Sequence, residues 1–417
     1  MSAIPPPLVA VVDGYSSGAH LVRELLDRGA ACLHVRSSPT VNPYYQATFN
    51  PSHYVDDLGH DPDPAAVAAR LTARGIQHVV AGTESGVALA DHLAHLTGRP
   101  GNVLELAPAR RNKFRMAEAL ADAGLDAPRS TLATDPDEAA QWFTGSGSDA
   151  VVVKPVDSAA SDHVRICRNA VEVSRAAADV LESANLFGTP NRTVLLQEFL
   201  EGPEYYVNTV SVDGRHLVVE TWRYTKSRTP DGAPVFDFEE PADPESPQVQ
   251  GLHRYLSEAL TALGIRNGAA HSEVVLTSRG PVLIDPGARL GGGVLPWVSA
   301  KLAGHSHAGL LAAGIVNPPE LSAAALPLRW ERPIRYVSLI NHFPGTVADL
   351  GWRDRLADLP TAVAVAALPS PGTHLPRTHD LLTSPGFLYL SGTTHEEVEA
   401  DYRTIRGWER SPLYTGP

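Results

Sequence analysis

Two short apolar runs joined by a tight turn constrain the fold of this chain more than any other segment. The runs are 274–276 and 282–284, and Ser278-Arg279-Gly280-Pro281 lies between them. Apolar runs of this length on either side of a Gly-Pro turn predict a β-hairpin. Such a hairpin brings Glu273 and Asp285 close together, although they are well separated along the chain.

The two acids of this hairpin repel each other unless a cation lies between them. Mg²⁺ favours one or two carboxylates together with phosphate oxygens. Arg289 follows the second acid, and Gly291-Gly292-Gly293 comes soon after it. A guanidinium in that place is suited to a transferring phosphoryl group or a developing oxyanion. The alternative is a surface hairpin with solvated acids, and the hairpin alone does not separate the two interpretations.

Composition and charge indicate a globular protein of several domains. The 417 residues are too many for one ordinary core, and 43% are hydrophobic while 19% are charged. The 34 Lys and Arg against 47 Asp and Glu give a net charge of −13. We therefore expect no nucleic-acid partner, because such a surface needs basic patches. We also expect no membrane partner, because no run of about eighteen apolar residues occurs.

Two cysteines, Cys32 and Cys167, are present in the whole sequence. Two thiols are too few for a disulfide framework in a chain of this size, and they favour a reducing compartment. Residues 1–7 lack the basic and apolar regions of a signal peptide. We therefore expect a cytoplasmic protein.

The N-terminal part alternates between short apolar runs and amphipathic segments. Strands are expected at 8–12, 31–35 and 78–81, and helices at 20–28, 64–74 and 82–96. This alternation predicts a small parallel α/β unit. Ligands of such sheets bind at the carboxyl ends of the strands, and Glu84 lies at such an end.

The rest of the chain mixes strands and helices. Helices are expected at 110–123, 170–184, 248–263 and 394–408, and strands at 150–153, 194–197, 205–212, 216–221, 336–340, 362–367 and 387–390. The segment 226–245 is polar and rich in Pro and Asp, so we expect a flexible loop or lid there.

Lys154 ends an expected buried strand and precedes a loop of small residues, 158–161. Small side chains let backbone N–H groups approach phosphate oxygens, and the ammonium adds positive charge. The chain has no Walker A motif, and it lacks the Gly-x-Gly-x-x-Gly of a Rossmann oxidoreductase. The alternative for Lys154 is a strand lysine whose ammonium reaches the solvent.

The segment Gln197-Glu198-Phe199-Leu200 joins an expected strand to the following hairpin. The backbone edges of such a linker offer a donor and an acceptor to an adenine, and a carboxylate such as Glu204 suits a ribose diol. Acidic turns are common, so a purely structural role is the alternative.

In their order along the chain, these pieces resemble the ATP-grasp superfamily of carboxylate–amine ligases, nearest to the bacterial L-amino-acid (dipeptide) ligases. The resemblance rests on Lys113 within 111–116, on 153–155, on 197–202, on Glu273 and on 283–292. It covers about 5–310, and 380–389 is similar to the closing β-rich subdomain of biotin-carboxylase-like members.

The resemblance implies an ATP-grasp fold of the α/β class, with α+β organisation in the ATP-binding part. The implied units are an N-terminal parallel α/β pre-ATP-grasp domain, a linking helix, the small (lid) subdomain, the large subdomain with the metal site, and a C-terminal β-rich subdomain. Their expected bounds are 1–108, 109–128, 129–196, 197–325 and 326–417.

The implied cofactors are ATP and Mg²⁺, with Mn²⁺ as an alternative. The resemblance gives each matching position a role: phosphate contacts at Lys113, Lys154 and Ser161, adenine contacts at Gln197, Glu198 and Leu200, a ribose contact at Glu204, metal ligands at Glu273 and Asp285, and catalytic charges at Lys154 and Arg289.

The implied reaction phosphorylates a carboxylate with ATP and then joins the acyl group to an amine, so the expected partners are small-molecule carboxylate and amine substrates. A homodimer is an alternative that the sequence leaves open.

Glu84 is a candidate to bind an ammonium group of a substrate, and Arg223, Lys226 and His271 are candidates to bind a carboxylate or to act near the amine. Gly293 is a candidate for the wall of a roomy acyl-donor pocket. Each of these has a structural role as its alternative.

Three departures from the family pattern matter. Asp285 replaces the usual Glu, Gly287 stands where Asn is usual, and the loop 158–162 lacks glycines. They leave open the number of metal ions. They also leave two rivals to the ligase: bicarbonate-dependent carboxylation by the same fold, and a nucleotide-binding protein without catalysis.

Overall fold

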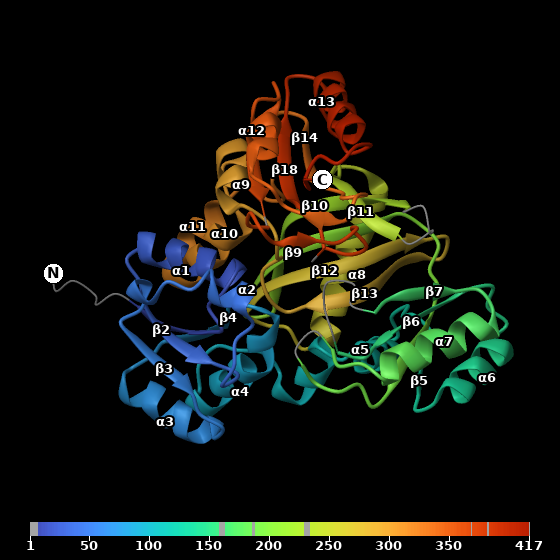
Figure 1. Ribbon diagram of the computed structural model, residues 1–417. Helices are drawn as coiled ribbons and strands as arrows, with labels where there is room; N and C mark the ends of the chain where they lie inside the picture. The colour runs from blue at the N-terminus through green and yellow to red at the C-terminus, as the bar shows by residue number, and fades with distance from the viewer. Residues whose placement is uncertain are drawn as a thin grey trace.

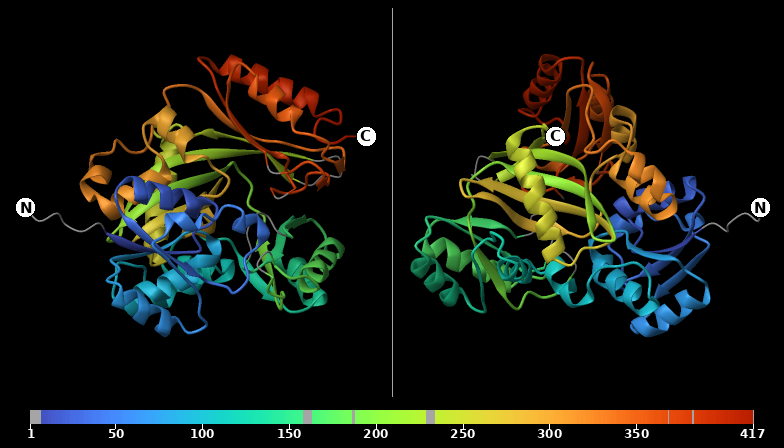
Figure 2. Two further views of the ribbon diagram at one scale, coloured as in Figure 1. Left: turned by 60° about the vertical axis from the view of Figure 1, so that its left-hand side comes forward. Right: turned by 180° about the vertical axis from the view of Figure 1, so that it is seen from behind.

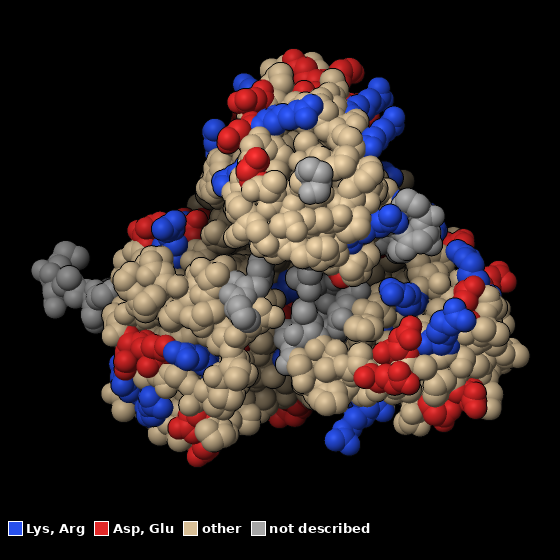
Figure 3. Space-filling model, viewed as in Figure 1, with Lys and Arg blue, Asp and Glu red and all other residues tan. Residues whose placement is uncertain are grey.

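The computed structural model describes residues 7–157, 163–185, 188–228, 234–367, 369–381 and 383–416. Ser161, one of the expected phosphate contacts, lies outside these residues. Three lobes surround a large central sheet (Figure 1). The face seen in Figure 3 is hollowed where the three lobes meet. This hollow is where the candidate site lies.

The N-terminal lobe is the parallel sheet that the sequence predicts. Its strands are all parallel and have the order β3-β2-β1-β4. The elements are β1 (Leu8–Val12), α1 (Ser17–Asp27), β2 (Ala31–Arg36), α2 (Pro43–Gln46), η1 (Pro51–His53), β3 (Asp56–His60), α3 (Pro64–Ala73), β4 (His78–Ala81), η2 (Glu84–Gly86) and α4 (Val87–Thr97). Strand β3 was not expected, because it is a polar edge strand in which Leu58 alone is buried.

Polar side chains tie the carboxyl ends of these strands together. The carboxylate of Asp13, which follows β1, accepts hydrogen bonds from the Ser37 amide at 2.9 Å, the Ser37 hydroxyl at 2.5 Å and the Ser85 hydroxyl at 2.5 Å. Ser37 follows β2, and Ser85 follows β4. Glu84 begins η2 at the same edge, as the sequence predicts.

A buried arginine joins the N-terminal lobe to the rest. Arg110 ends η3 (Leu104–Arg110) and is fully buried. It donates to Asp91 of α4 at 2.6 Å and to the Leu263 carbonyl at 2.9 Å, so its charge is paired and hydrogen-bonded. The following helix, α5 (Lys113–Asp122), begins three residues later than expected. Its N-cap is Asn112, whose side chain accepts from two backbone amides of the first turn.

The small lobe is an antiparallel sheet with the order β5-β8-β6-β7 and two covering helices. Its elements are β5 (Ser130–Ala133), α6 (Pro136–Ser146), β6 (Val151–Pro155), β7 (Arg165–Cys167), α7 (Ala170–Leu181) and β8 (Val194–Glu198). Lys154 and Gln197 lie on the neighbouring strands β6 and β8.

The large sheet has the order β13-β12-β9-β10-β11-β14-β18-β16. Its strands are β9 (Glu204–Val212), β10 (Arg215–Arg228), β11 (Pro234–Pro241), β12 (Gly268–Thr277), β13 (Gly280–Gly287), β14 (Ile334–Ser338), β16 (Ala362–Ala367) and β18 (Gly386–Ser391). The C-terminal strands therefore extend the same sheet. Helix α8 (Pro247–Ala262) covers its back face, where Leu252 and Leu256 pack against Val207 and Val274 (Figure 2).

The expected loop or lid at 226–245 is wrong for 226–228 and 234–241, whereas 242–245 lie outside the strands as predicted. Strand β10 continues to Arg228, and β11 pairs with it in antiparallel fashion. Asp237, one of the polar residues that suggested a loop, is buried in the sheet and accepts hydrogen bonds from Arg406 at 2.6 Å and from Tyr402 at 2.9 Å. Composition misled because these charges have partners far away in the sequence.

The remaining elements belong to the C-terminal lobe and to the helices beside the N-terminal lobe. They are α9 (Pro296–Ala303), α10 (His307–Val316), α11 (Pro318–Ala323), β15 (Gly345–Thr346), α12 (Gly351–Ala357), β17 (His374–Leu375) and α13 (His395–Trp408). Within the described ranges, none of the helices is long and apolar enough to cross a lipid bilayer.

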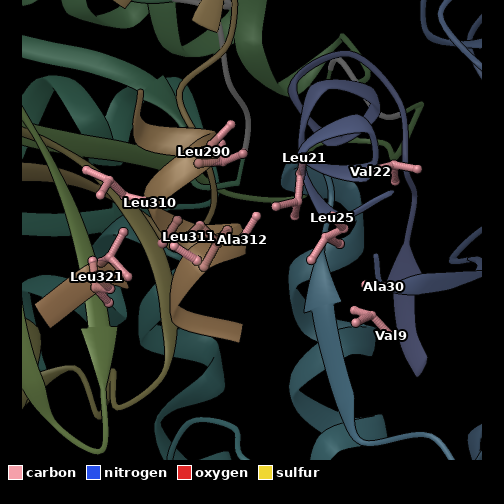
Figure 4. Close-up of a cluster of buried hydrophobic side chains, with 14 of the residues drawn as sticks. Val9, Leu21, Val22, Leu25, Ala30, Leu290, Leu310, Leu311, Ala312 and Leu321 are labelled. Atoms are coloured by element: carbon pink, nitrogen blue, oxygen red, sulfur yellow. The ribbon is translucent and has the colours of Figure 1, made fainter. Parts of the chain in front are cut away.

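A hydrophobic core fixes the N-terminal lobe against α10. Leu21 and Leu25 of α1 face Leu310 and Leu311 of α10, and Leu290 belongs to the same core (Figure 4). Leu290 is 3% exposed and directly follows Arg289. Burial of such side chains is worth about 1.5–3 kcal/mol each. The backbone of Arg289 is therefore anchored by the packing between two lobes.

Candidate active site

The hairpin of β12 and β13 places the two expected metal ligands side by side. Glu273 and Asp285 are direct partners in the antiparallel register, and a bulge follows Glu273. Direct partners lie on the same face of a sheet. Burial, reinforced by repulsion from Asp285, raises the pKa of Glu273 to about 7. A cation that binds between two carboxylates relieves their mutual repulsion and stabilises the pair.

Two buried lysines from different lobes reach this acid pair. Lys113, the first residue of α5, lies 3.1 Å from the Asp285 carboxylate. Burial opposes the charge of Lys113, but the attraction of Asp285 and the hydrogen bond that Lys113 donates to it hold the pKa of Lys113 above the usual value. Burial and the neighbouring Lys113 lower the pKa of Lys154 to about 8. The Lys154 ammonium donates to the Gln197 side chain at 2.8 Å, so β6 and β8 hold it in place.

Arg289 is paired with Glu84. The distance from Arg289 Nε to Glu84 Oε2 is 2.8 Å, and the Arg111 Nε lies 3.9 Å from the other oxygen. Glu84, the candidate for an ammonium group, thus has a guanidinium as its partner. Gly287 makes this possible: a Cβ there would lie 3.2 Å from Arg289 Cζ and 3.0 Å from the His271 carbonyl. The usual Asn would require the Arg289 guanidinium and the His271 carbonyl to move slightly apart.

The expected adenine linker is held by ion pairs. The Glu198 carboxylate is 6% exposed and accepts from Arg279 at 2.6 Å and Arg129 at 3.1 Å. Burial opposes its ionisation, yet these hydrogen bonds keep the pKa of Glu198 below its usual value. The Glu198 side chain is therefore already bound by two arginines. The backbone from Glu198 to Leu200 is the part of the linker that can still bind an adenine. Gln197 is occupied by Lys154.

The expected ribose contact, Glu204, binds an expected substrate contact. Both oxygens of its carboxylate lie within 2.8 Å of the Lys226 ammonium. That ammonium also lies 4.6 Å from the centre of the Phe236 ring. The structure thus brings Glu204 and Lys226 together.

Two further substrate candidates have different outcomes. His271 lies on the site face beside Glu273, and its Nδ1 is 2.8 Å from Asn208 Oδ1. Burial, and then repulsion from Arg289, keeps the pKa of His271 well below its usual value, so the ring is neutral. Arg223 is not in the site. It alternates with Trp222 and Tyr224 along β10, and it therefore points to the opposite face of the sheet, exposed.

Gly293 does not offer the open wall that we expected. It has a φ of +73°, and a Cβ there would lie 3.1 Å from the Tyr336 hydroxyl. That hydroxyl donates to the Gly293 carbonyl at 2.7 Å. Gly291 is also closed, since its Cβ would lie 2.9 Å from His271 Nδ1. Gly292 has nothing within 4 Å, so the free space is beside this residue.

Most of the polar and aromatic residues on the site face of the large sheet were not predicted from the sequence. They follow the expected Glu204 and alternate along β9, β10 and β11: Tyr206 and Asn208, then Glu220, Trp222 and Tyr224, then Glu239. The two-residue period was visible in the hairpin that the sequence already predicted. Glu239 was hidden by its assignment to a loop.

The donor set at the acid pair fits a hard divalent cation that also binds phosphate. Within the described part of the chain, no cluster of three or more His, Cys, Asp and Glu side chains forms a closed metal site. Two carboxylate oxygens with the remaining ligands supplied by substrate and water is the arrangement that Mg²⁺ favours.

Comparison with known proteins gives the family. Residues 111–227 match the phosphoribosylglycinamide synthetase, ATP-grasp (A) domain. The chain is 32% identical to dapdiamide A synthase of Enterobacter agglomerans, over 95% of this chain and 96% of that one.

Two solved structures share the fold. L-amino acid ligase from Bacillus licheniformis superposes with a TM-score of 0.75 at 20% identity and covers 97% of this chain and 98% of its own. N5-carboxyaminoimidazole synthase from Aspergillus clavatus, in complex with ADP, superposes with a TM-score of 0.71 at 14% identity over 98% of this chain and all of its own (100%). The chain belongs to the ATP-grasp superfamily of carboxylate–amine ligases and is an ATP-dependent enzyme that forms an amide bond.

Proposed function

We propose that the enzyme activates the carboxylate of one amino acid as an acyl phosphate and joins it to the amine of a second amino acid. One observation carries this proposal: the acids Glu273 and Asp285 meet the buried ammonium of Lys113, and Arg289 lies beside them. Charges of both signs, held in place before any ligand binds, suit a phosphoryl transfer that depends on positioning and electrostatics.

ATP occupies the space between the small lobe and the large sheet. Its phosphate oxygens replace Asp285 as the partner of Lys113 and Gln197 as the partner of Lys154. Its adenine binds the backbone from Glu198 to Leu200. The ribose lies beside Glu204 and Lys226. Glu273 and Asp285 would hold Mg²⁺, with Mn²⁺ as an alternative for the same oxygen donors, and the ion would offset phosphate charge.

The reaction then has two steps. A carboxylate oxygen of the first substrate attacks the γ-phosphorus, the bond to the bridging oxygen breaks, and ADP leaves. The amine nitrogen of the second substrate attacks the acyl carbon, loses a proton, and phosphate leaves. Lys154 and Arg289 stabilise the negative charge that develops in both steps. Glu84 orients Arg289 through their hydrogen bond.

The relative named dapdiamide A synthase supports amide formation over bicarbonate-dependent carboxylation, because it matches this chain from end to end while the synthase-like structures share only the fold. We also propose that the enzyme is cytoplasmic. Both cysteines are free thiols and are buried, and free thiols are usual in a reducing compartment.

Phosphate release with ATP, Mg²⁺ and amino acids in pairs tests this function, with mass spectrometry of the products. We expect ADP and phosphate to form in equal amounts with an amide whose mass is the sum of the two amino acids less one water. ADP formed with bicarbonate alone, and unaffected by amino acids, would replace the proposal with the carboxylation chemistry. No ADP with any pair would leave a nucleotide-binding protein.

A further inference from the structure

A buried acid on the site face has no counter-charge. Glu239 of β11 is 7% exposed, and no ion pair among the described residues involves it. Its neighbour Glu240 differs in both respects, since it is half-exposed and lies 2.7 Å from the Arg335 guanidinium. A carboxylate that is taken out of water without a cation loses several kcal/mol of hydration. Glu239 therefore lacks the ion pair that stabilises the charge of its neighbour Glu240.

Tyrosine rings surround this carboxylate. Tyr224 and Tyr336 are the direct register partners of Glu239 on β10 and β14, so all three lie on one face. Tyr206 donates a hydrogen bond to Glu239. The ring centres of Tyr206 and Tyr224 are 5.1 Å apart, and those of Tyr336 and Tyr389 are 4.6 Å apart. The faces of aromatic rings attract cations.

The charges around Glu239 also favour a cation. Glu220 and Glu273 lie near enough to repel it, and the cation that acts on it, Lys226, is held by both oxygens of Glu204. Burial, opposed by the Tyr206 hydrogen bond and reinforced by these two acids, raises the pKa of Glu239 to about 8. A bound cation reverses this, because it favours the ionised carboxylate.

The acid lies near Glu273, one of the two expected metal ligands, and near the glycine segment. Tyr336 and Tyr389, which flank it, hold the glycine segment that follows Arg289: the Tyr336 hydroxyl donates to the Gly293 carbonyl at 2.7 Å, and the Leu295 amide donates to the Tyr389 hydroxyl at 3.3 Å. A group bound at Glu239 is therefore enclosed by the same segment that borders the open space at Gly292.

We propose that Glu239 and the tyrosines around it form the subsite for the ammonium group of an amino-acid substrate. This deepens the function proposed above and rests on it. The ammonium donates to the carboxylate and lies against the rings. In an acyl donor, the carboxylate of the same molecule points toward Arg289. In an amine acceptor, the ammonium passes a proton to Glu239, and the resulting amine attacks the acyl carbon. The subsite rejects a molecule in which the ammonium is replaced by hydrogen, because Glu239 then stays buried without a partner.

The competing account is structural: a protonated Glu239 that only hydrogen-bonds to Tyr206. The two accounts differ in E239Q, which keeps the shape and the hydrogen bond from Tyr206 but cannot pair with an ammonium. The full chain is heated with L-phenylalaninamide, which carries an ammonium, and with 3-phenylpropanamide, which lacks it. We expect the first to raise the Tm of the wild type more than the second, and E239Q to lose this difference.

E239D and E258Q complete the set. E239D keeps the charge and is expected to keep part of the ammonium preference. Glu258 is exposed on α8, and E258Q changes the same group far from the site, so it should behave as the wild type. If wild type and E239Q respond alike to the two probes, the subsite is refuted.

Turnover separates the subsite from the proposed function. For the active amino-acid pair, E239Q should raise the KM of one amino acid roughly 10- to 100-fold, which is the loss expected for a hydrogen bond between charged groups. The KM of ATP should stay within about twofold of the wild type. The affected amino acid identifies the donor or the acceptor as the bound molecule. A wild type that shows the ammonium-selective shift without turnover would refute the ligase substrates but keep the cation site.

Discussion

The two ends of the site treat charge in opposite ways. At the nucleotide end, the acids and bases are already paired: Lys113 with Asp285, Lys226 with Glu204, and Arg279 with Glu198. At the tyrosine end, Glu239 is buried and forms no ion pair with any of the described residues. Residues that already form ion pairs can exchange these partners for the phosphates of ATP and its metal ion. An acid without an ion pair can instead bind a cation directly. The difference implies that ATP displaces existing contacts and that the amino acid completes a missing one.

Replacing Arg289 should break the site most strongly. R289M removes the guanidinium beside the acid pair, and we expect kcat to fall by about 10²–10³-fold, the usual effect of losing one donor to a developing negative charge. The KM of ATP should change little. The measurement is steady-state ADP release. R115M is the matched control, because Arg115 lies exposed on α5 and pairs only with Glu118 among the described residues. An R289M enzyme with normal kcat would remove Arg289 from the chemistry.

Replacing Asp285 tests the paired end next. D285N removes one acid of the hairpin and the partner of Lys113. We expect Mg²⁺ to bind the enzyme–nucleotide complex at least roughly tenfold more weakly, as titration calorimetry with a non-hydrolysable ATP analogue would measure. Relief of the repulsion should also lower the pKa of Glu273. Unchanged Mg²⁺ affinity in D285N would place the ion elsewhere.

The pH dependence of ATP binding follows from Lys154. Its pKa lies near 8, below the usual lysine value, so the free enzyme loses this ammonium as the pH rises through 8. Phosphate binds the charged form, and we therefore expect the KM of ATP to rise about tenfold between pH 7 and pH 9. K154R stays charged over this range and should flatten the rise. A KM that is equally pH-dependent in K154R would assign the effect to another group.

Alanine substitutions at two neighbouring glycines should have the smallest effect of these predictions, a local change in stability. G293A forces a side chain into a left-handed backbone and toward the Tyr336 hydroxyl, so we expect a loss of about 1–2 kcal/mol of stability. G292A points into open space and should cost less. Thermal unfolding compares the two. G292W, rather than the Gly293 variant that the sequence suggested, should exclude bulky substrates and spare small ones. Equal Tm values for G292A and G293A would contradict this account of the segment.

The parts of the fold that the sequence predicted have local patterns. Strand β1 of the N-terminal sheet is a continuous apolar run, and the β12–β13 hairpin is marked by its Gly-Pro turn. The parts that it missed depend on distant partners. The chain separates Arg289 from Glu84 by 205 positions, so no local signal reports their pairing. Glu239 and Asp237 looked like loop residues until their partners on β10 and α13 were known.

A crystal structure of the enzyme with Mg²⁺, a non-hydrolysable ATP analogue and an amino acid would test the exchange of partners most directly. We predict that Glu273 and Asp285 both ligate the ion, that Lys113 has left Asp285 for a phosphate oxygen, and that an ammonium lies against Glu239. An ion ligated by other side chains, with Lys113 still bound to Asp285, would contradict the account.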